Sequence, residues 1–140
     1  MWSRLPAAAI AGFVLIAGLA WRFIEAQPED VADYGTPLVS VEVPKLQGAA
    51  REGEALFNDK CASCHGRNAA GQEGVAPPLV HRIYEPNHHG DGAFLIAALQ
   101  GVRAHHWPFG NMPPVPGVTP DDVGKIVAYV RTLQKANGIF

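Results

Sequence analysis

Residues 61–65 read Cys-Ala-Ser-Cys-His and contain the only two cysteines of the 140-residue chain. Cysteines at i and i+3 on one helical turn project to the same side, and His65 follows the second one directly. In this order the two thiols can add to the two vinyl groups of a porphyrin, and the imidazole then lies beneath the ring. The motif therefore predicts one haem c bound covalently through Cys61 and Cys64, with His65 as an iron ligand.

Two other chemistries also use closely spaced cysteines. A structural disulfide or a thioredoxin-like dithiol is less consistent with this chain, because that redox motif follows a strand in a βαβ pattern, which the sequence lacks. A zinc site would need two more ligands, and the chain has no second C-x-x-C and no H-x₃₋₅-H pair. Histidines that would be available to such a site are His81, His88, His89, His105 and His106.

Three helices are predicted around the motif. The first covers about residues 49–60, and the second covers about 91–102 with Asp91 as a plausible N-cap. The third has the clearest start, with Thr119 as N-cap, Pro120 at the first helical position and two acidic residues in the first turn. Its expected buried stripe consists of Val123, Ile126, Val127, Val130 and Leu133.

From Gly48 to Gln134 the chain resembles a class I cytochrome c. Gly53 and Phe57, in G-x-x-x-F before the cysteines, resemble the N-terminal helix of that family, whose small residue lets the C-terminal helix cross closely. The matching residues of the crossing helix are Ile126, Tyr129 and Leu133. The resemblance implies an all-α class I cytochrome c fold, in which the haem itself forms much of the core.

The resemblance also suggests how the iron is held. The segment Pro77-Pro78-Leu79 is similar to the one whose proline carbonyl accepts a hydrogen bond from the proximal histidine; the P-x-L spacing favours Pro77, and Pro78 is the alternative. Met112, in GNMPP, stands where the family places its axial thioether. His105 and His106 are competing candidates for the sixth ligand, and Met112 is preferred.

Polar residues near the haem are expected to hydrogen-bond its propionates, as they do in this family. The candidates are Arg82, Trp107, Tyr84 and the histidines of two pairs, His88-His89 and His105-His106. The simplest interpretation of the two pairs is that they lie in solvated loops. Binding of a second metal ion such as copper between them is the other hypothesis.

The N-terminal part differs in composition from the rest. Leu5 to Ile24 is about 20 residues long with one charge near its end, enough for a membrane-spanning helix of about 30 Å. We therefore expect residues 1–26 to form an anchor or, alternatively, a cleaved signal segment. Residues 27–47, which are acidic and contain three prolines, are expected to form an extended linker, with a weakly signalled strand at 38–43. The haem domain would then occupy residues 48–140.

The expected function follows from the predicted ligands. A His/Met-ligated iron has no open position for a substrate, so the chain is expected to carry single electrons and not to be an enzyme. Arg4 and the N-terminal amine favour a cytoplasmic N-terminus, which puts the haem domain on the periplasmic side of the inner membrane. The partners would be redox proteins at the membrane. An obligate subunit of a larger membrane oxidoreductase is the alternative, and a haem enzyme or sensor with a labile Met112 is a third.

Charge excludes another class of partner. The chain has 11 basic and 13 acidic residues and no basic run, so it offers no surface for nucleic-acid phosphates. Its acidic excess lies in the predicted linker, and the haem domain carries no strong net field to steer a partner over long range.

Overall fold

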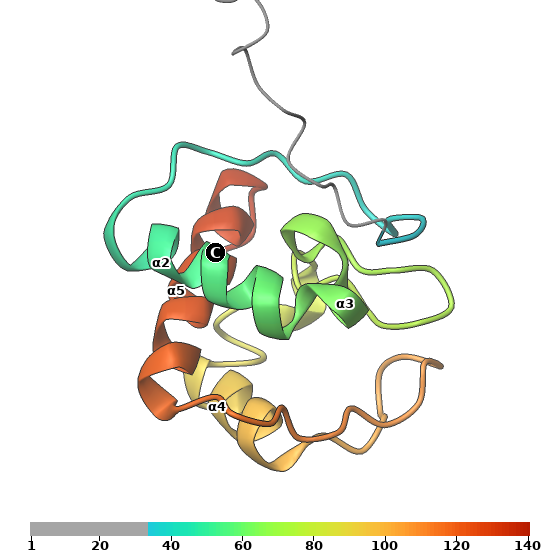
Figure 1. The fold of residues 1–140 in the computed structure, drawn as a ribbon. Helices are drawn as coiled ribbons and strands as arrows, with labels where there is room; N and C mark the ends of the chain where they lie inside the picture. The colour runs from blue at the N-terminus through green and yellow to red at the C-terminus, as the bar shows by residue number, and fades with distance from the viewer. Residues whose placement is uncertain (1–33) are drawn as a thin grey trace, which may run out of the picture. The chain divides into compact units, whose positions relative to one another are not determined.

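The computed structural model describes residues 34–140 (Figure 1). The predicted anchor or signal segment, and the linker up to residue 33, lie outside these residues. Within the described range, no helix is both long and apolar enough to cross a membrane. The structure is helical, as predicted, and regular strands are absent from the described range. Its elements are α2 (Gly48–Lys60), α3 (Ala62–His65), η1 (Arg67–Ala69), η2 (Arg82–Tyr84), α4 (Asp91–Gln100) and α5 (Pro120–Ala136).

Helices α2 and α5 cross each other and form the main packing contact (Figure 1). They approach so closely at Gly53 that a Cβ there would lie 1.9 Å from the backbone oxygen of Lys125. On the same side, the rings of Phe57 and Tyr129 pack with centroids 5.4 Å apart, and both side chains are fully buried together with Leu133. The crossing implied by the resemblance is therefore present, and a small residue at position 53 makes it possible.

Helix α5 begins as its sequence predicts. The Thr119 hydroxyl accepts a hydrogen bond from Asp122 N, and the Asp122 carboxylate accepts one from Thr119 N, which completes a capping box with Pro120 at the first helical position. The predicted apolar stripe is buried along its length. Two further buried residues, Tyr129 and Gln134, extend that face.

Helix α4 begins at Asp91, the first residue of the predicted range, but its N-cap and its C-terminal end differ from the prediction. Gly90, not Asp91, is the N-cap, because the Asp91 carboxylate instead accepts a hydrogen bond from Arg131 Nε at 2.8 Å. The helix ends at Gln100, two residues earlier than expected, because Gly101 adopts φ +79°, a conformation that terminates a helix. The helix has no buried residue, and Ile96 is 56% exposed although it is apolar.

Residues 34–47 pack onto the helical domain without forming the weakly signalled strand. Leu38 N and Val39 N donate to the Ala70 carbonyl, and Glu42 exchanges two hydrogen bonds with the Asn137 side chain. Residues 34–47 thus belong to the same compact unit as the helices.

Candidate functional site

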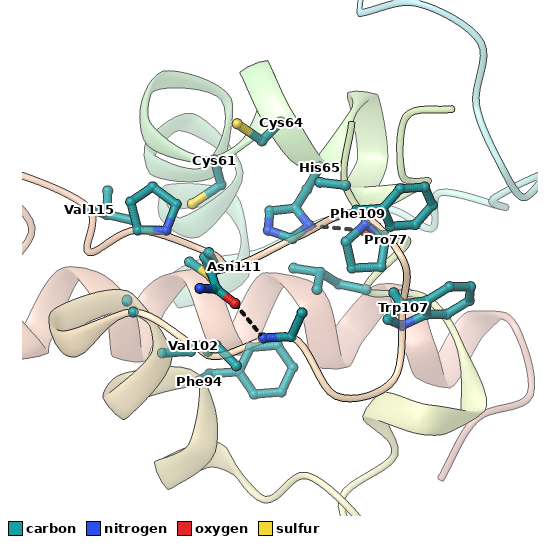
Figure 2. A pocket seen from close by; sticks show the side chains of 18 of the residues that line it. Cys61, Cys64, His65, Pro77, Phe94, Val102, Trp107, Phe109, Asn111 and Val115 are labelled. Carbon is teal, nitrogen blue, oxygen red and sulfur yellow. Dashed lines mark hydrogen bonds between the residues drawn. The ribbon is translucent and has the colours of Figure 1, made fainter. Parts of the chain in front are cut away.

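The cysteine motif lies at the junction of two helices. Cys61 is the last residue associated with α2, and the short helix α3 then carries Cys64 and His65. Both cysteines are free thiols that line one side of a cavity, with His65 beside them (Figure 2). Burial, and to a lesser extent the neighbouring Cys64, raises the pKa of the Cys61 thiol to about 11. The disulfide interpretation gains no support from this arrangement.

The His65 ring is buried and held by one hydrogen bond. Its Nδ1 lies 2.9 Å from the carbonyl oxygen of Pro77, and since a carbonyl only accepts, the ring nitrogen must donate (Figure 2). The bond runs to Pro77 and not to Pro78. Burial lowers the pKa of His65, and the Pro77 hydrogen bond partly opposes this shift. The ring is therefore neutral near pH 7, with Nε2 as the free nitrogen, which is the form that ligates a metal.

The cavity has a volume of about 600 Å³, and its lining is mostly apolar. Figure 2 shows Cys61, Cys64 and His65 along one side, with Phe94 and Val102 on the opposite side. The exposed apolar face of α4 forms part of this wall, since Ala93, Phe94, Ile96 and Ala97 all line it. The exposure of Ile96 thus reflects its position on the cavity.

Met112 lines the same cavity and sits at the base of a closed loop. Its backbone exchanges two 2.9 Å hydrogen bonds with Val102, forming an isolated antiparallel bridge, and Asn111 Oδ1 accepts a hydrogen bond from Ala104 N inside the loop. Gly101 is required beside the bridge, because a Cβ there would lie 2.6 Å from the Met112 carbonyl oxygen. The structure thus brings Met112 and His65 to one cavity from chain segments far apart in sequence.

Trp107 also lines the cavity, and its buried indole nitrogen makes no well-formed hydrogen bond in the described chain, although it interacts with the Tyr84 side chain. A buried N–H without a well-formed hydrogen bond costs free energy, so this group favours a ligand that brings an acceptor. Tyr84 lines the cavity too. Arg82 does not: its side chain is exposed and lies outside the lining, so the structure does not bring it to this site.

These residues fit a covalently bound haem. The free thiols of the two cysteines and the neutral imidazole of His65 share one side of an apolar cavity. The thioether of Met112 lines this cavity as well, and the buried indole N–H of Trp107 lacks a well-formed hydrogen bond. A zinc site at the cysteines is not supported. In the part of the chain that the structure describes, the one cluster of three or more metal-binding side chains consists of histidines alone.

Two residues of α5 that were not predicted from the sequence, Arg131 and Gln134, hydrogen-bond to the segments around the cavity. Arg131 donates to the Asp91 carboxylate and to the carbonyls of Tyr84 and His89, and its guanidinium lies 4.9 Å from the Phe94 ring centroid. Gln134 is buried and donates from Nε2 to the carbonyls of Leu79 and Tyr84. An arginine and a glutamine near the end of an amphipathic helix give no sequence signal of such contacts.

The fold and the site together define a haem-binding domain of the cytochrome c type. The model of the cytochrome c family matches residues 50–134, and the chain belongs to this family, whose cofactor is haem c. The resemblance noted from the sequence is thereby confirmed.

Two curated relatives bear the name of an oxidase subunit. The chain is 36% identical over 86 residues to the Cbb3-type cytochrome c oxidase subunit CcoP of Rubrivivax gelatinosus, an alignment that covers 60% of this chain and 26% of that protein. It is 32% identical over 111 residues to the Cbb3-type cytochrome c oxidase subunit FixP of Azorhizobium caulinodans, which covers 78% of this chain and 35% of that protein. The chain thus spans roughly a quarter to a third of the length of these relatives.

Proposed function

We propose that this protein transfers single electrons through one haem c and is not itself an enzyme. When bound, haem c supplies one iron that gains or loses a single electron. The observation that carries the proposal is the pair of candidate ligands in one cavity: a buried His65 with its Nε2 free, and Met112 held by the Val102 bridge. With both in place, no coordination position remains for a small-molecule substrate.

The chain's own residues serve this role by fixing the surroundings of the iron. The Pro77 carbonyl orients the His65 ring and makes it a better donor. The thioether of Met112 is a soft ligand that favours the reduced iron and raises the potential. The apolar wall built by α4 limits contact with water, so little solvent rearranges when the charge changes.

The experiment that tests this function replaces Met112. The oxidised parent protein is expected to show a weak sulfur-to-iron charge-transfer band in the far red. Met112→Ala is expected to lose the band, bind CO when reduced and have a lower potential. Met112→His is expected to remain six-coordinate, with a potential lowered toward bis-histidine values. His105→Gln, the matched control at the competing ligand, should retain the band. A parent protein that lacks the band, or that loses ligation on changing His105 or His106, would contradict the assignment.

A second candidate function is that of a fixed subunit in a larger membrane oxidase. It is favoured by one observation, the names of the two relatives. Purification of the native protein in mild detergent distinguishes the two roles. A fixed subunit is expected to elute with partner proteins at constant stoichiometry, and a free carrier is expected to elute alone.

The proposed location is the periplasmic face of the cytoplasmic membrane, with residues 1–26 as a single-pass anchor. The composition of Leu5 to Ile24 supports it. Replacing residues 1–26 with a foreign, cleavable signal should make the protein soluble without changing its haem spectrum. A native protein whose N-terminus begins at Trp21 or Gln27 would identify the segment as a signal peptide instead.

A further inference from the structure

Two histidine pairs lie together in the fold; His89, His105 and His106 also line the haem cavity, whereas His88 does not. His88 and His89 precede α4, and His105 and His106 lie in the loop that the Val102–Met112 bridge closes. Within the described chain, ligand nitrogens of His88, His89 and His106 lie within 4.8 Å of one another. The His105 ring is close as well, with its centroid 4.3 Å from that of His106.

Backbone hydrogen bonds fix the tautomers of two of these rings. Nδ1 of His89 bonds to the Ile83 carbonyl, and Nδ1 of His105 lies 2.9 Å from the Arg103 carbonyl. Each nitrogen must donate, because a carbonyl only accepts, so Nε2 is left with a free lone pair in both rings. Metal-binding histidines are commonly oriented in this way, with the second ring nitrogen donating to a backbone carbonyl.

The spacing of the free nitrogens also suits a metal ion. Nε2 of His88 and Nε2 of His106 are 3.3 Å apart. Two nitrogens that each lie about 2.0–2.1 Å from a tetrahedral ion would be about 3.3–3.4 Å apart, so this pair already has ligand spacing. A hydrogen bond between two neutral rings has a similar length, but it accounts for only two of the histidines.

We propose that His88, His89 and His106 form a binding site for a divalent first-row transition-metal ion, which is separate from the haem iron. Imidazole nitrogen suits copper, zinc and nickel, and copper(II) is expected to bind most tightly because it stands highest in the order of divalent affinities. His105 is a further ligand within reach. An ion here would link the segment before α4 to the loop that ends at Met112.

The test is titration of the full-length, ferric holoprotein with copper(II) alone, followed by calorimetry and EPR. One copper(II) per protein is expected, with nitrogen couplings in its EPR signal. His88→Gln removes a proposed ligand that does not line the haem cavity. Its affinity for copper(II) is expected to fall at least about tenfold, since even the loss of an outer partner of a ligand costs about 10- to 100-fold.

The matched control is His81→Asn. His81 is outside the cluster and accepts a hydrogen bond from Ile83 N, a contact that an asparagine side chain can also make. This variant is expected to bind copper(II) as the parent does, and both variants should keep the haem spectrum of the parent. Absence of stoichiometric binding, or equal affinity in the parent and His88→Gln, would overturn the proposal; the second result would also reveal binding elsewhere, such as at the N-terminal amine.

Discussion

The buried side chain of Gln134 joins α5 to two other segments of the chain by hydrogen bonds. Its Nε2 donates to the carbonyls of Leu79 and Tyr84, and its Oε1 accepts from Arg131. Gln134→Leu would keep the bulk but leave the Leu79 carbonyl without this donor inside the protein. An unsatisfied buried group costs about 1–3 kcal/mol, so we expect the free energy of unfolding to fall by about that amount, as measured by denaturant titration of the holoprotein.

The matched control is Gln100→Leu, at an exposed position at the end of α4. Exposed substitutions usually change stability by less than about 0.5 kcal/mol. Equal losses in the two variants would show that the Gln134 contacts contribute nothing specific.

At the scale of elements, the crossing of α2 and α5 depends on Gly53. Gly53→Ala would put a Cβ 1.9 Å from the backbone oxygen of Lys125, which is fixed within α5 and cannot move aside on its own. We expect the helices to be forced apart, with a loss of about 1–3 kcal/mol or more, typical of overpacking. Thermal unfolding of the holoprotein measures this loss.

The matched control is Gly124→Ala on α5, which is expected to change the stability in the opposite direction. Nothing lies within 4 Å of a Cβ at Gly124, which is exposed within α5. Alanine is favoured over glycine by about 0.8–1.0 kcal/mol inside a helix, so this variant is expected to be more stable than the parent. A Gly53→Ala variant that is also stabilised would refute the close crossing.

The capping box of α5 predicts a dependence on pH. Hydrogen bonds from the Thr119 side chain and backbone lower the pKa of Asp122 below its usual 3.8. A carboxyl group with a lowered pKa in the folded state adds stability above its unfolded pKa, and this contribution is lost as the pH falls through the folded value. Asp122→Ala should therefore have a lower melting temperature than the parent at pH 7, and the difference should shrink below about pH 4. A difference that persists unchanged at low pH would argue against an ionised cap.

Local signals explain which elements could be predicted from the sequence. The start of α5 is signalled by three residues close together in sequence, Thr119, Pro120 and Asp122, and the helix begins at Pro120 in the structure. The N-cap of α4 was predicted wrongly, because Asp91 is engaged by Arg131, forty residues away. A partner so distant in the chain becomes visible only when the fold is known.

The residues of the site also differ in how far the sequence predicts them. Cys61, Cys64 and His65 are adjacent in sequence, so their chemistry could be read directly. Pro77 and Met112 required the family resemblance, and the Gln134 contacts needed the coordinates, since its two carbonyl partners, Leu79 and Tyr84, are at least 50 residues away in sequence. Arg82 was expected at the haem, but its exposed side chain lies outside the cavity lining.

For the whole molecule, the haem is expected to be part of the fold. The double variant Cys61→Ala/Cys64→Ala should retain no pigment after acid-acetone extraction. Without a ligand the cavity of about 600 Å³ exposes its apolar lining, so we expect the variant to be cleaved by protease first within residues 91–118, before α5. Mass spectrometry of the fragments checks this order. Covalent pigment in the double variant would refute attachment through these cysteines.

Because α4 buries no side chain of its own, its position has a consequence for maturation. The ring contact between Phe57 and Tyr129 joins α2 to α5 directly, and α4 adds only the partly buried Phe94 to that cluster, so the α2–α5 contact can form before α4 packs beside the cysteines. A porphyrin that approached from the side of α4 would reach both thiols before α4 packed over the cavity. Covalent attachment would then give the exposed face of α4 a surface to pack on.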